Sequence, residues 1–335
     1  MKKARVLSGV RVTHRLHIGN YWGAVRNWIQ LQNSDQYECF FGVMDWHGLT
    51  TAYKTSSETS GYTRDIFADL VAWGLDPEKI TLFIQSHVSE HLELFMIFAN
   101  LTPMGWLERV PTWKDAEEES KQNDTHNLGR FAYPVLQAAD IALYQGALVP
   151  VGADQVAHLE LSREIVRRFN HIYKSDLPEM RPMLTETPLV SGLDGRKMSK
   201  SYNNTLFLTE DSEKTLQKKI NSMLTDPQRA RREDPGNPEV CPVYGYHKLY
   251  SSKEDLDWVV QGCRSAGIGC GDCKKRLTEN IEKVTQGPRE IKKALLSDTV
   301  KLDRIIRSGC EKAKSEAQIT LKKIRKNMKW DLNNL

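Results

Sequence analysis

Hydrophobic and polar residues alternate along the first half of the chain in the rhythm of strands followed by helices. Apolar runs at 5–8, 37–44, 80–86 and 147–152 predict strands, because a parallel strand covered on both faces reads as a continuous apolar run. The intervening segments carry apolar residues at helical spacing. This order predicts an α/β fold with a Rossmann-like, doubly wound parallel sheet.

The pattern changes after residue 205. From 206 to 335 the spacing is helical, with a Pro/Gly-rich break at 232–242, and no run predicts a strand. We therefore expect a catalytic α/β domain with a helical insertion over 1–205 and a helical domain over 206–335. Ligands of a doubly wound sheet bind beyond the carboxyl ends of the strands, so the polar groups at 45–47 and 85–86 are candidate site residues.

Composition is that of an ordinary globular protein, with 40% hydrophobic and 27% charged residues among 335. No apolar stretch approaches the roughly 18 residues of a membrane span, and the N-terminus lacks a signal-peptide core, so we expect a cytoplasmic protein. The net charge is only +4, but basic clusters at 229–233, 273–276, 289–293 and 321–330 all lie in the last third. Together they favour a polyanion-binding surface, although a solvated helix face explains any one of them equally well.

Two loops carry candidate chemistry. The turn "HIGN" at 17–20 follows the first strand, where free backbone N–H groups at a helix start suit a phosphate and Gly19 leaves room for a nucleotide. About 180 residues later, "GRKMSKSYNN" at 195–204 places Lys197 and Lys200 in a glycine- and asparagine-containing loop. Such a cationic loop is suited to binding an anion.

Together the two loops resemble the signature pair of class I aminoacyl-tRNA synthetases. In that family an amino-acid carboxylate attacks the α-phosphate of ATP and expels pyrophosphate, and catalysis consists of alignment and charge neutralisation. The resemblance implies that His17 and Asn20 hold the nucleotide. It also implies that Lys197 and Lys200, on a mobile loop, follow the departing pyrophosphate.

Three further stretches, at 108–115, 133–144 and 149–170, are similar to tryptophanyl-tRNA synthetases, and the resemblance covers nearly the whole chain. It is strongest for the bacterial branch that carries a 4Fe-4S cluster. The resemblance implies activation of L-tryptophan with ATP and Mg²⁺, transfer to tRNA(Trp), an anticodon-binding role for the helical domain, and a homodimer. The apolar run at 94–101 fits a dimer contact, although a core helix explains it equally well.

The resemblance also implies a set of site residues. Asp140 would accept the single N–H of the indole, which rejects side chains without that donor. The rest of the implied tryptophan site is His47, Tyr133, Gln137 and Gln155. The implied nucleotide site comprises Arg11, Val12, Thr13, His17, Gly19, Asn20, Lys114, Gly152, Ala153, Asp154, Leu189, Lys197, Met198, Ser199, Lys200 and Ser201.

Some positions depart from the family pattern, and other functions stay open. Val12 and His14 stand where the family usually has Pro and Gly, and Ala153 stands where an acidic residue is customary. Tyrosyl-tRNA synthetases use the same Tyr-x3-Gln-x2-Asp spacing for a phenol. An adenylyltransferase of the same fold, or a synthetase paralogue serving as a tRNA- or protein-binding module, are further alternatives.

The last feature is a group of four cysteines. Cys241, Cys263, Cys270 and Cys273 follow the spacing C-x21-C-x6-C-x2-C, while Cys39 and Cys310 stand apart. Clustered thiols in a reducing compartment predict a metal site. Four thiolates suit both zinc and an iron–sulfur cluster, and the resemblance favours 4Fe-4S.

We expect this metal site to lie outside the activation chemistry and to support the tRNA-binding surface. The adjacent side chains of Lys274, Lys275 and Arg276 would then contact phosphates.

Overall fold

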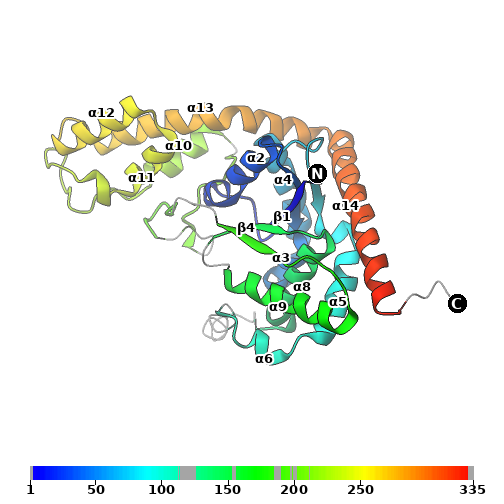
Figure 1. The fold of residues 1–335 in the computed structure, drawn as a ribbon. Helices are drawn as coiled ribbons and strands as arrows, with labels where there is room; N and C mark the ends of the chain where they lie inside the picture. The colour runs from blue at the N-terminus through cyan, green and yellow to red at the C-terminus, as the bar shows by residue number, and fades with distance from the viewer. Residues whose placement is uncertain are drawn as a thin grey trace. The chain divides into compact units, whose positions relative to one another are not determined.

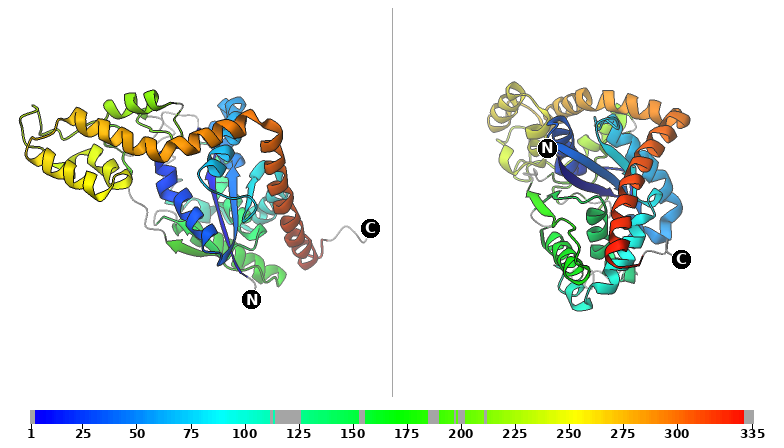
Figure 2. Two further views of the ribbon diagram at one scale, coloured as in Figure 1. Left: turned by 90° about the horizontal axis from the view of Figure 1, so that it is seen from above. Right: turned by 45° about the vertical axis from the view of Figure 1, so that its right-hand side comes forward.

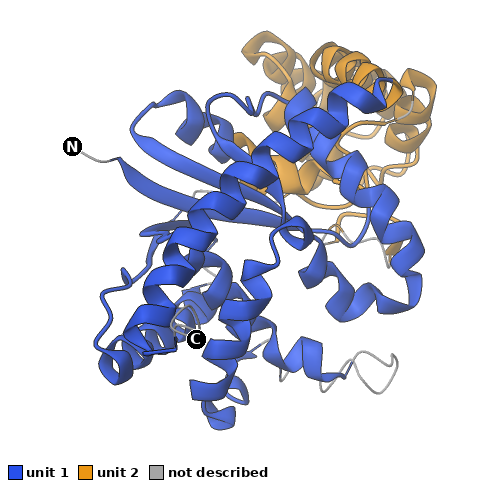
Figure 3. Cartoon of the chain, turned by 90° about the vertical axis from the view of Figure 1, so that its right-hand side faces the viewer, with its two compact units in different colours: residues 1–14, 27–186, 298–335 blue, residues 15–26, 187–297 orange. Residues whose placement is uncertain are grey.

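The computed structural model describes residues 3–111, 113, 126–152, 156–184, 190–196, 198, 202–210 and 212–330. The chain folds as two compact units (Figure 3). Unit 1 contains residues 1–14, 27–186 and 298–335, and unit 2 contains residues 15–26 and 187–297. These two units do not follow the predicted boundary between residues 205 and 206, and the predicted division into functional domains stays a prediction.

Unit 1 is built on a five-stranded sheet in the order β3-β2-β1-β4-β5 (Figure 1). The strands are β1 Ala4–Arg11, β2 Tyr37–Met44, β3 Thr81–Ile84, β4 Leu148–Val151 and β5 Arg181–Leu184. All neighbouring strands are parallel, which confirms the predicted α/β fold class. The order reverses between β1 and β4, and the carboxyl ends of strands at such a switch point are where doubly wound sheets bind ligands.

Four of the five strands were predicted, and β5 was not. Its sequence contains Arg181 and Pro182, and Leu184 is 67% exposed. An edge strand with solvent on one side needs no continuous apolar run. The pattern that reveals the buried strands therefore fails for this one.

Helices surround the sheet of unit 1. They are α2 Arg26–Asn33, α3 Asp45–Ala52, α4 Ser56–Ala72, α5 Glu90–Leu101, α6 Met104–Leu107, α8 Leu128–Leu143, α9 Val156–Tyr173 and α14 Thr299–Asn327. α5, α8 and α9 pack against one another (Figure 1). α14, the last helix, packs along the edge strand β3 (Figure 2).

The first helical segment differs from its prediction. It consists of α1 Ile18–Asn20, a π-helical turn η1 Tyr21–Val25, and α2. Regular helical spacing from Ile18 would bury Trp22 and Ile29, but both are only half-buried, whereas Trp28 is fully buried. A π turn holds more residues than an α turn, so it rotates the buried face away from the positions that α-helical spacing predicts.

Unit 2 is helical, as its sequence predicts, and its described residues form no extended strand. Its longer elements are α10 Glu213–Asn221, α11 Pro242–Tyr250, α12 Lys253–Arg264 and α13 Cys270–Ser297, with a 3₁₀ turn at Pro238–Val240. α10 and α11 both pack against α13. The core of the unit, called here the unit 2 core, consists of Ile18, Leu193, Met198, Leu206, Leu216, Ile220, Met223, Val243, Tyr246, Leu277 and Ile281.

In the part of the chain that the structure describes, no helix is both long and apolar enough to cross a bilayer.

Gly309 lets α14 lie directly on β3. A Cβ at this position would lie 1.9 Å from the backbone oxygen of Leu82, a distance that no rotamer change can relieve. We expect Gly309→Ala to lower the free energy of unfolding by about 1–3 kcal/mol or more, the cost of overpacking, as measured by chemical denaturation. Gly61→Ala in α4 is the matched control, because a Cβ added there would have no atom within 4 Å; it should be neutral or slightly stabilising. Equal stabilities of the two variants would contradict this account.

Candidate functional site

Asp140, on α8, is a buried carboxylate that accepts hydrogen bonds from three side chains. Nε2 of Gln85 lies 2.9 and 3.0 Å from its two oxygens, Nδ1 of His91 lies 2.6 Å from Oδ1, and Nε2 of His47 lies 2.7 Å from Oδ2. His47 follows β2 and Gln85 follows β3, so the group lies at the carboxyl edge of the sheet. Because a carboxylate only accepts hydrogen bonds, the two contacting imidazole nitrogens are the protonated ones.

The same contacts keep Asp140 ionised. Burial alone would raise its pKa, but the contacts with His91 and His47 outweigh that effect and lower the pKa of Asp140 to about 2. Behind His91, the Tyr144 hydroxyl lies 2.7 Å from its Nε2. Burial, with the neighbouring Asp140 charge, raises the pKa of Tyr144 well above its usual value. The site therefore presents a fixed negative charge to N–H donors at neutral pH.

The acceptor capacity of Asp140 is already used. Its two oxygens offer about four lone-pair positions, and the Gln85, His91 and His47 contacts occupy all of them. A further donor must replace one of the three side chains. His91 and Gln85 are completely buried, whereas the His47 side chain is 12% exposed, so His47 is the donor that an incoming group can replace.

Other predicted tryptophan-site residues lie on the same helix. Tyr133 and Gln137 precede Asp140 on α8, at helical spacing that places them near one face of the helix. The Tyr133 hydroxyl lies 2.6 Å from Nε2 of the buried His158. The rings of Tyr133 and His47 meet edge to face, with centroids 6.3 Å apart. The structure thus brings His47, Tyr133 and Asp140 together.

Sequence reasoning missed part of this site. Gln85 was among the predicted candidates, because a polar residue directly after a strand carries a signal. His91, Tyr144 and His158 carry none, because each lies inside an amphipathic helix or at its end. There, a polar residue on the buried side cannot be told from a solvated one.

Part of the predicted nucleotide site lies at the ends of the two central strands. Val12 and Thr13 follow β1, and Gly152 follows β4. Gly48 is required beside Val12, because a Cβ there would lie 2.0 Å from the Val12 backbone oxygen. Arg11, at the end of β1, donates to the His47 backbone oxygen at 2.9 Å.

His14, which departs from the residue usual in the family at this position, has a local structural role. Its ring stacks on Tyr62 of α4, with centroids 4.5 Å apart.

The "HIGN" turn is closed by its own side chains. The backbone N–H of His17 donates to Oδ1 of Asn20 at 3.0 Å, and the Asn20 N–H donates to the His17 oxygen at 2.8 Å. At Gly19, a Cβ would lie 3.0 Å from the His17 ring and 4.0 Å from the Met198 sulfur. Ile18 and Met198 both belong to the unit 2 core. The two signature loops therefore meet in unit 2.

Several predicted site residues lie outside the described part of the chain. They are Lys114, Ala153, Asp154, Gln155, Leu189, Lys197, Ser199, Lys200 and Ser201.

The four predicted metal ligands line one small cavity in unit 2. Cys241 precedes α11, Cys263 lies in α12, and Cys270 and Cys273 begin α13. Burial, followed by the three neighbouring thiols, raises the pKa of Cys273 to about 12, so the thiols are electrostatically coupled. All of them are free.

Gly236 and Arg229 lie beside these thiols. Gly236 is required, because a Cβ there would lie 2.6 Å from the Cys263 sulfur. Arg229 also lines the cavity, fixed by hydrogen bonds to the backbone oxygens of Arg232 and Ile268 at 2.6 and 2.8 Å. Its buried Nε has no hydrogen-bond partner in the described part of the chain.

The cavity is nevertheless not a formed single-metal site. Among the described residues, no set of three or more His, Cys, Asp or Glu side chains is placed so that it could hold a metal ion. A zinc ion draws its four sulfurs to about 2.3 Å. The four thiols share a space without meeting that requirement.

The basic clusters are less available than the sequence predicts. Lys274 donates to the backbone oxygens of Asn221 and Met223 at 2.8 and 2.6 Å, and Arg276 pairs with Asp255 at 2.8 Å. In α14, Lys323 pairs with Asp176 and Arg325 with Glu93. Within the described residues, only Lys275 of the three basic residues after Cys273 is exposed without such a contact.

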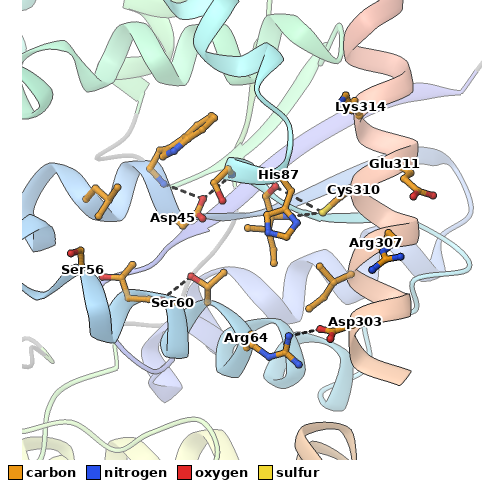
Figure 4. Close-up of a pocket in the computed structure, with 17 residues that line it drawn as sticks. Asp45, Ser56, Ser60, Arg64, His87, Asp303, Arg307, Cys310, Glu311 and Lys314 are labelled. Atoms are coloured by element: carbon orange, nitrogen blue, oxygen red, sulfur yellow. Dashed lines mark hydrogen bonds and ion pairs between the residues drawn. The ribbon is translucent and has the colours of Figure 1, made fainter. Parts of the chain in front are cut away.

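Unit 1 also contains a large cavity. It measures about 770 Å³ and opens between α4 and α14, next to the residues that follow β2 and β3 (Figure 4). Arg64 pairs with Asp303 across it, and its wall carries Ser and Thr hydroxyls and charges of both signs. Asp45 and Ser86, two of the polar candidates at the strand ends, line it, but none of the described residues predicted to bind tryptophan, the nucleotide or the metal does, so its size alone does not make it the functional site.

Comparison with known proteins supports the geometry. The family model of class I tRNA synthetases for tryptophan and tyrosine matches residues 1–286. A tryptophan–tRNA ligase of Thermotoga maritima is 47% identical over 325 residues, covering 97% of this chain and 98% of the relative. One from Aquifex aeolicus is 39% identical, covering 97% of this chain and 99% of the relative.

Solved structures show the same fold. A tryptophanyl-tRNA synthetase from Campylobacter jejuni, crystallised with ADP and tryptophan, matches with a TM-score of 0.87 and 35% identity. The match covers 97% of this chain and 99% of that one. A tyrosyl-tRNA synthetase from Archaeoglobus fulgidus matches with a TM-score of 0.65 at 18% identity, which shows the shared fold alone.

Proposed function

The chain belongs to the class I tRNA synthetases of the tryptophan and tyrosine family, and we propose that it activates L-tryptophan with ATP and transfers it to tRNA(Trp). Its full-length similarity to tryptophan–tRNA ligases supports tryptophan over tyrosine. The observation that carries the proposal is Asp140, a buried, ionised acceptor at the carboxyl edge of the sheet. The similarity to proteins named as ligases over nearly the full chain also argues against a role as a binding module only.

Asp140 selects the substrate by accepting the indole N–H. Because the four acceptor positions of Asp140 are occupied in the free protein, the indole takes the place of His47, the exposed donor. His91 and Gln85 stay in place and hold the carboxylate. An amino acid with an apolar ring leaves Asp140 short of a donor, and an unpaired buried charge strongly disfavours its binding. Tyr133, Gln137 and Gln155 line the rest of the pocket in this proposal.

The activation step is a displacement at the α-phosphate of ATP. His17 and Asn20 align the nucleotide, and Lys114, Lys197 and Lys200 neutralise charge on the phosphates and on the leaving pyrophosphate, with Mg²⁺ as the ATP counter-ion. Arg11, Val12, Thr13 and Gly152 border the nucleotide at the strand ends. Positioned cations of this kind act on the transition state, where charge develops. A cytoplasmic location, where charged tRNA is used, stays a prediction.

Two substitutions separate these roles in ATP–pyrophosphate exchange. Asp140→Asn keeps the side-chain volume but loses the ionised acceptor. Transition-state stabilisation with tryptophan, measured as kcat/KM, should therefore weaken by ~1–3 kcal/mol. Lys200→Met removes one cation from the leaving group, so kcat should fall roughly ten- to a thousandfold, with tryptophan affinity nearly unchanged.

Controls use the same preparations. Both variants should bind ATP and keep a cooperative thermal transition, which separates site effects from unfolding. Each standard amino acid is tested with the unmodified protein. Faster exchange with tyrosine than with tryptophan, or a Lys200→Met variant that lost only tryptophan affinity, would overturn the assignment.

For the four cysteines we propose a 4Fe-4S cluster as resident cofactor, with zinc as the alternative. The donor set is right for it, since Cys241, Cys263, Cys270 and Cys273 line one cavity. The Arg229 guanidinium beside them offsets thiolate charge. Cys241, Cys263, Cys270 and Cys273 would hold the cluster, one thiolate to each iron. The shared cavity supports a metal site, and the preference for the cluster over zinc rests on the resemblance of the sequence to the iron–sulfur branch. Its contribution is structural, a covalent link between α11, α12 and α13.

Metal analysis of anaerobically purified protein tests this assignment. We expect a brown preparation with about four irons per chain, since each thiolate holds one iron, and loss of the colour in Cys270→Ser. Cys310→Ser is the matched control, because this buried cysteine lies outside the cavity, and the variant should keep its iron. A colourless protein with stoichiometric zinc would replace the cluster by zinc, and a metal-free protein would remove the site.

The homodimer implied by the family fits an apolar surface on unit 1. Tyr53 and Leu92 line one apolar hollow, Met104 and Leu128 line another, and Asn127 belongs to both. These four apolar side chains are 39–78% exposed, and apolar side chains grouped in this way are typical of an interaction surface. The run at 94–101 contributes less than predicted, because Leu94, Ile97, Phe98 and Leu101 are core residues of α5.

Sedimentation measures the dimer directly. The unmodified chain should sediment at twice its mass of 38.3 kDa, and Leu128→Glu should shift it toward the monomer, because a charge in an apolar contact is costly to bury. Val300→Glu, equally exposed on α14, should leave the mass unchanged. A monomeric unmodified protein at micromolar concentration would refute the proposal.

A further inference from the structure

Helix α11 is part of the cysteine cavity. Cys241 is the residue immediately before the helix, and Val243 and Tyr244 line the same cavity. Near its other end, the buried His247 places Nε2 at 3.3 Å from the Cys273 sulfur and 3.2 Å from the Cys273 backbone oxygen. Any rearrangement of the four thiols therefore acts on α11 at two points.

The same helix contacts both signature segments of unit 2. The Tyr246 hydroxyl donates to the backbone oxygen of Ser191 at 2.6 Å, at the start of the segment that leads to Met198. The Tyr250 hydroxyl accepts a hydrogen bond from Nε1 of Trp22 at 3.0 Å, in the helical segment that follows the "HIGN" turn. α11 thus reaches the two segments that the proposed activation chemistry uses.

Packing joins the same three features. The unit 2 core contains Ile18 of the "HIGN" turn and Met198 of the loop at 195–204. It also contains Val243 and Tyr246 of α11. Cys241 and Cys273 pack against this core. Gly195 also approaches the first residue of the helix, because a Cβ there would lie 3.2 Å from Cγ of Pro242. Close-packed contacts of this kind transmit small displacements.

A second contact path runs beside the first. Lys274, the residue after Cys273, donates to the Met223 backbone oxygen at 2.6 Å. The next residue, Leu224, donates its N–H to the Leu193 oxygen at 3.0 Å. The segment at 190–196, which leads into the loop at 195–204, is therefore connected by hydrogen bonds through Met223 and Leu224 to the beginning of α13, as well as to α11.

We propose that Tyr246 is a positioning residue for the activation step, and that α11 makes this step depend on the state of the cysteine site. The inference rests on the proposed adenylation and, for its second half, on the proposed metal. With the four thiols held together, α11 keeps Ser191 and Trp22 in place, and with them the segments that carry the predicted catalytic residues. Loss of the metal frees α11 and loosens both segments. The metal site is therefore not separate from the activation chemistry, contrary to the expectation from sequence.

The Tyr246→Phe variant of the full-length, metal-loaded protein tests the first half. It removes one hydroxyl, so iron per chain and tryptophan affinity should stay unchanged, while the KM for ATP in pyrophosphate exchange should rise about two- to tenfold, as for one lost hydrogen bond. Tyr244→Phe is the matched control. This tyrosine is on the same helix and lines the cavity, and its hydroxyl makes no hydrogen bond to the described residues. Equal KM values for the two variants would overturn the role of Tyr246.

Amide hydrogen exchange of residues 190–196 tests the second half without relying on activity. Chelation of the metal should speed exchange in this segment and raise the KM for ATP in the unmodified protein. In the Tyr246→Phe variant, amide exchange of residues 190–196 should already be fast before chelation. Chelation should therefore change the exchange rate and the KM for ATP less than in the unmodified protein, as expected when the metal and Tyr246 act through the same contact. Unaltered exchange and KM after metal removal would overturn the coupling while leaving the metal site intact.

Two other results of these experiments also test the proposal: a protein without metal, and a Tyr246→Phe variant that does not fold. If the unmodified protein holds no metal, the proposed cofactor and the coupling fail together, but the Tyr246→Phe comparison still decides the positioning role. If Tyr246→Phe loses its cooperative thermal transition, Trp22→Phe replaces it, because this change removes the donor to Tyr250 and keeps an aromatic ring. An unchanged KM for ATP in Trp22→Phe would then overturn the proposal.

Discussion

The ionised carboxylate of Asp140 sets the most demanding constraint in unit 1. A buried charge is tolerated only when donors surround it, and here Gln85, His91 and His47 supply four hydrogen bonds. These donors come from the ends of β2 and β3 and from α5, so satisfying one carboxylate fixes the relative positions of three elements and α8. Recognition of an N–H donor is then a property of the fold, because the acceptor cannot rotate away to find another partner.

Unit 2 depends on a different kind of constraint, a single hydrophobic core with functional side chains on its border. The segments that resemble the nucleotide-binding signatures each place one apolar residue, Ile18 and Met198, in this core. Cys241 and Cys273 border the same core. In a close-packed interior a displacement on one side is transmitted to the other, so the proposed metal site and the proposed nucleotide chemistry would share one structural element rather than two independent ones.

The fold was largely predictable because its signals are local. The apolar run at 37–44 became β2 with the same bounds, and the helical spacing after 206 became α10 to α13. The failures have physical causes. β5 escaped because an edge strand needs no apolar run, and the π turn at Tyr21–Val25 changed the buried face of the first helix. Among the basic residues, Lys274, Lys323 and Arg325 are held in contacts that only distant residues provide.

What the sequence determined by itself was the chemistry available: the two signature loops and the four clustered cysteines, readable as residue types at fixed spacing, and the Asp140 carboxylate, which the family resemblance implied. The tertiary structure alone decided the partners. His91 lies 49 residues from Asp140 along the chain and Tyr246 lies 55 residues from Ser191. No local pattern marks either pair, because a hydrogen bond between distant residues depends on how the elements pack. Local sequence patterns thus identify the side chains that carry the chemistry, whereas the residues that hold these side chains in place depend on the tertiary packing.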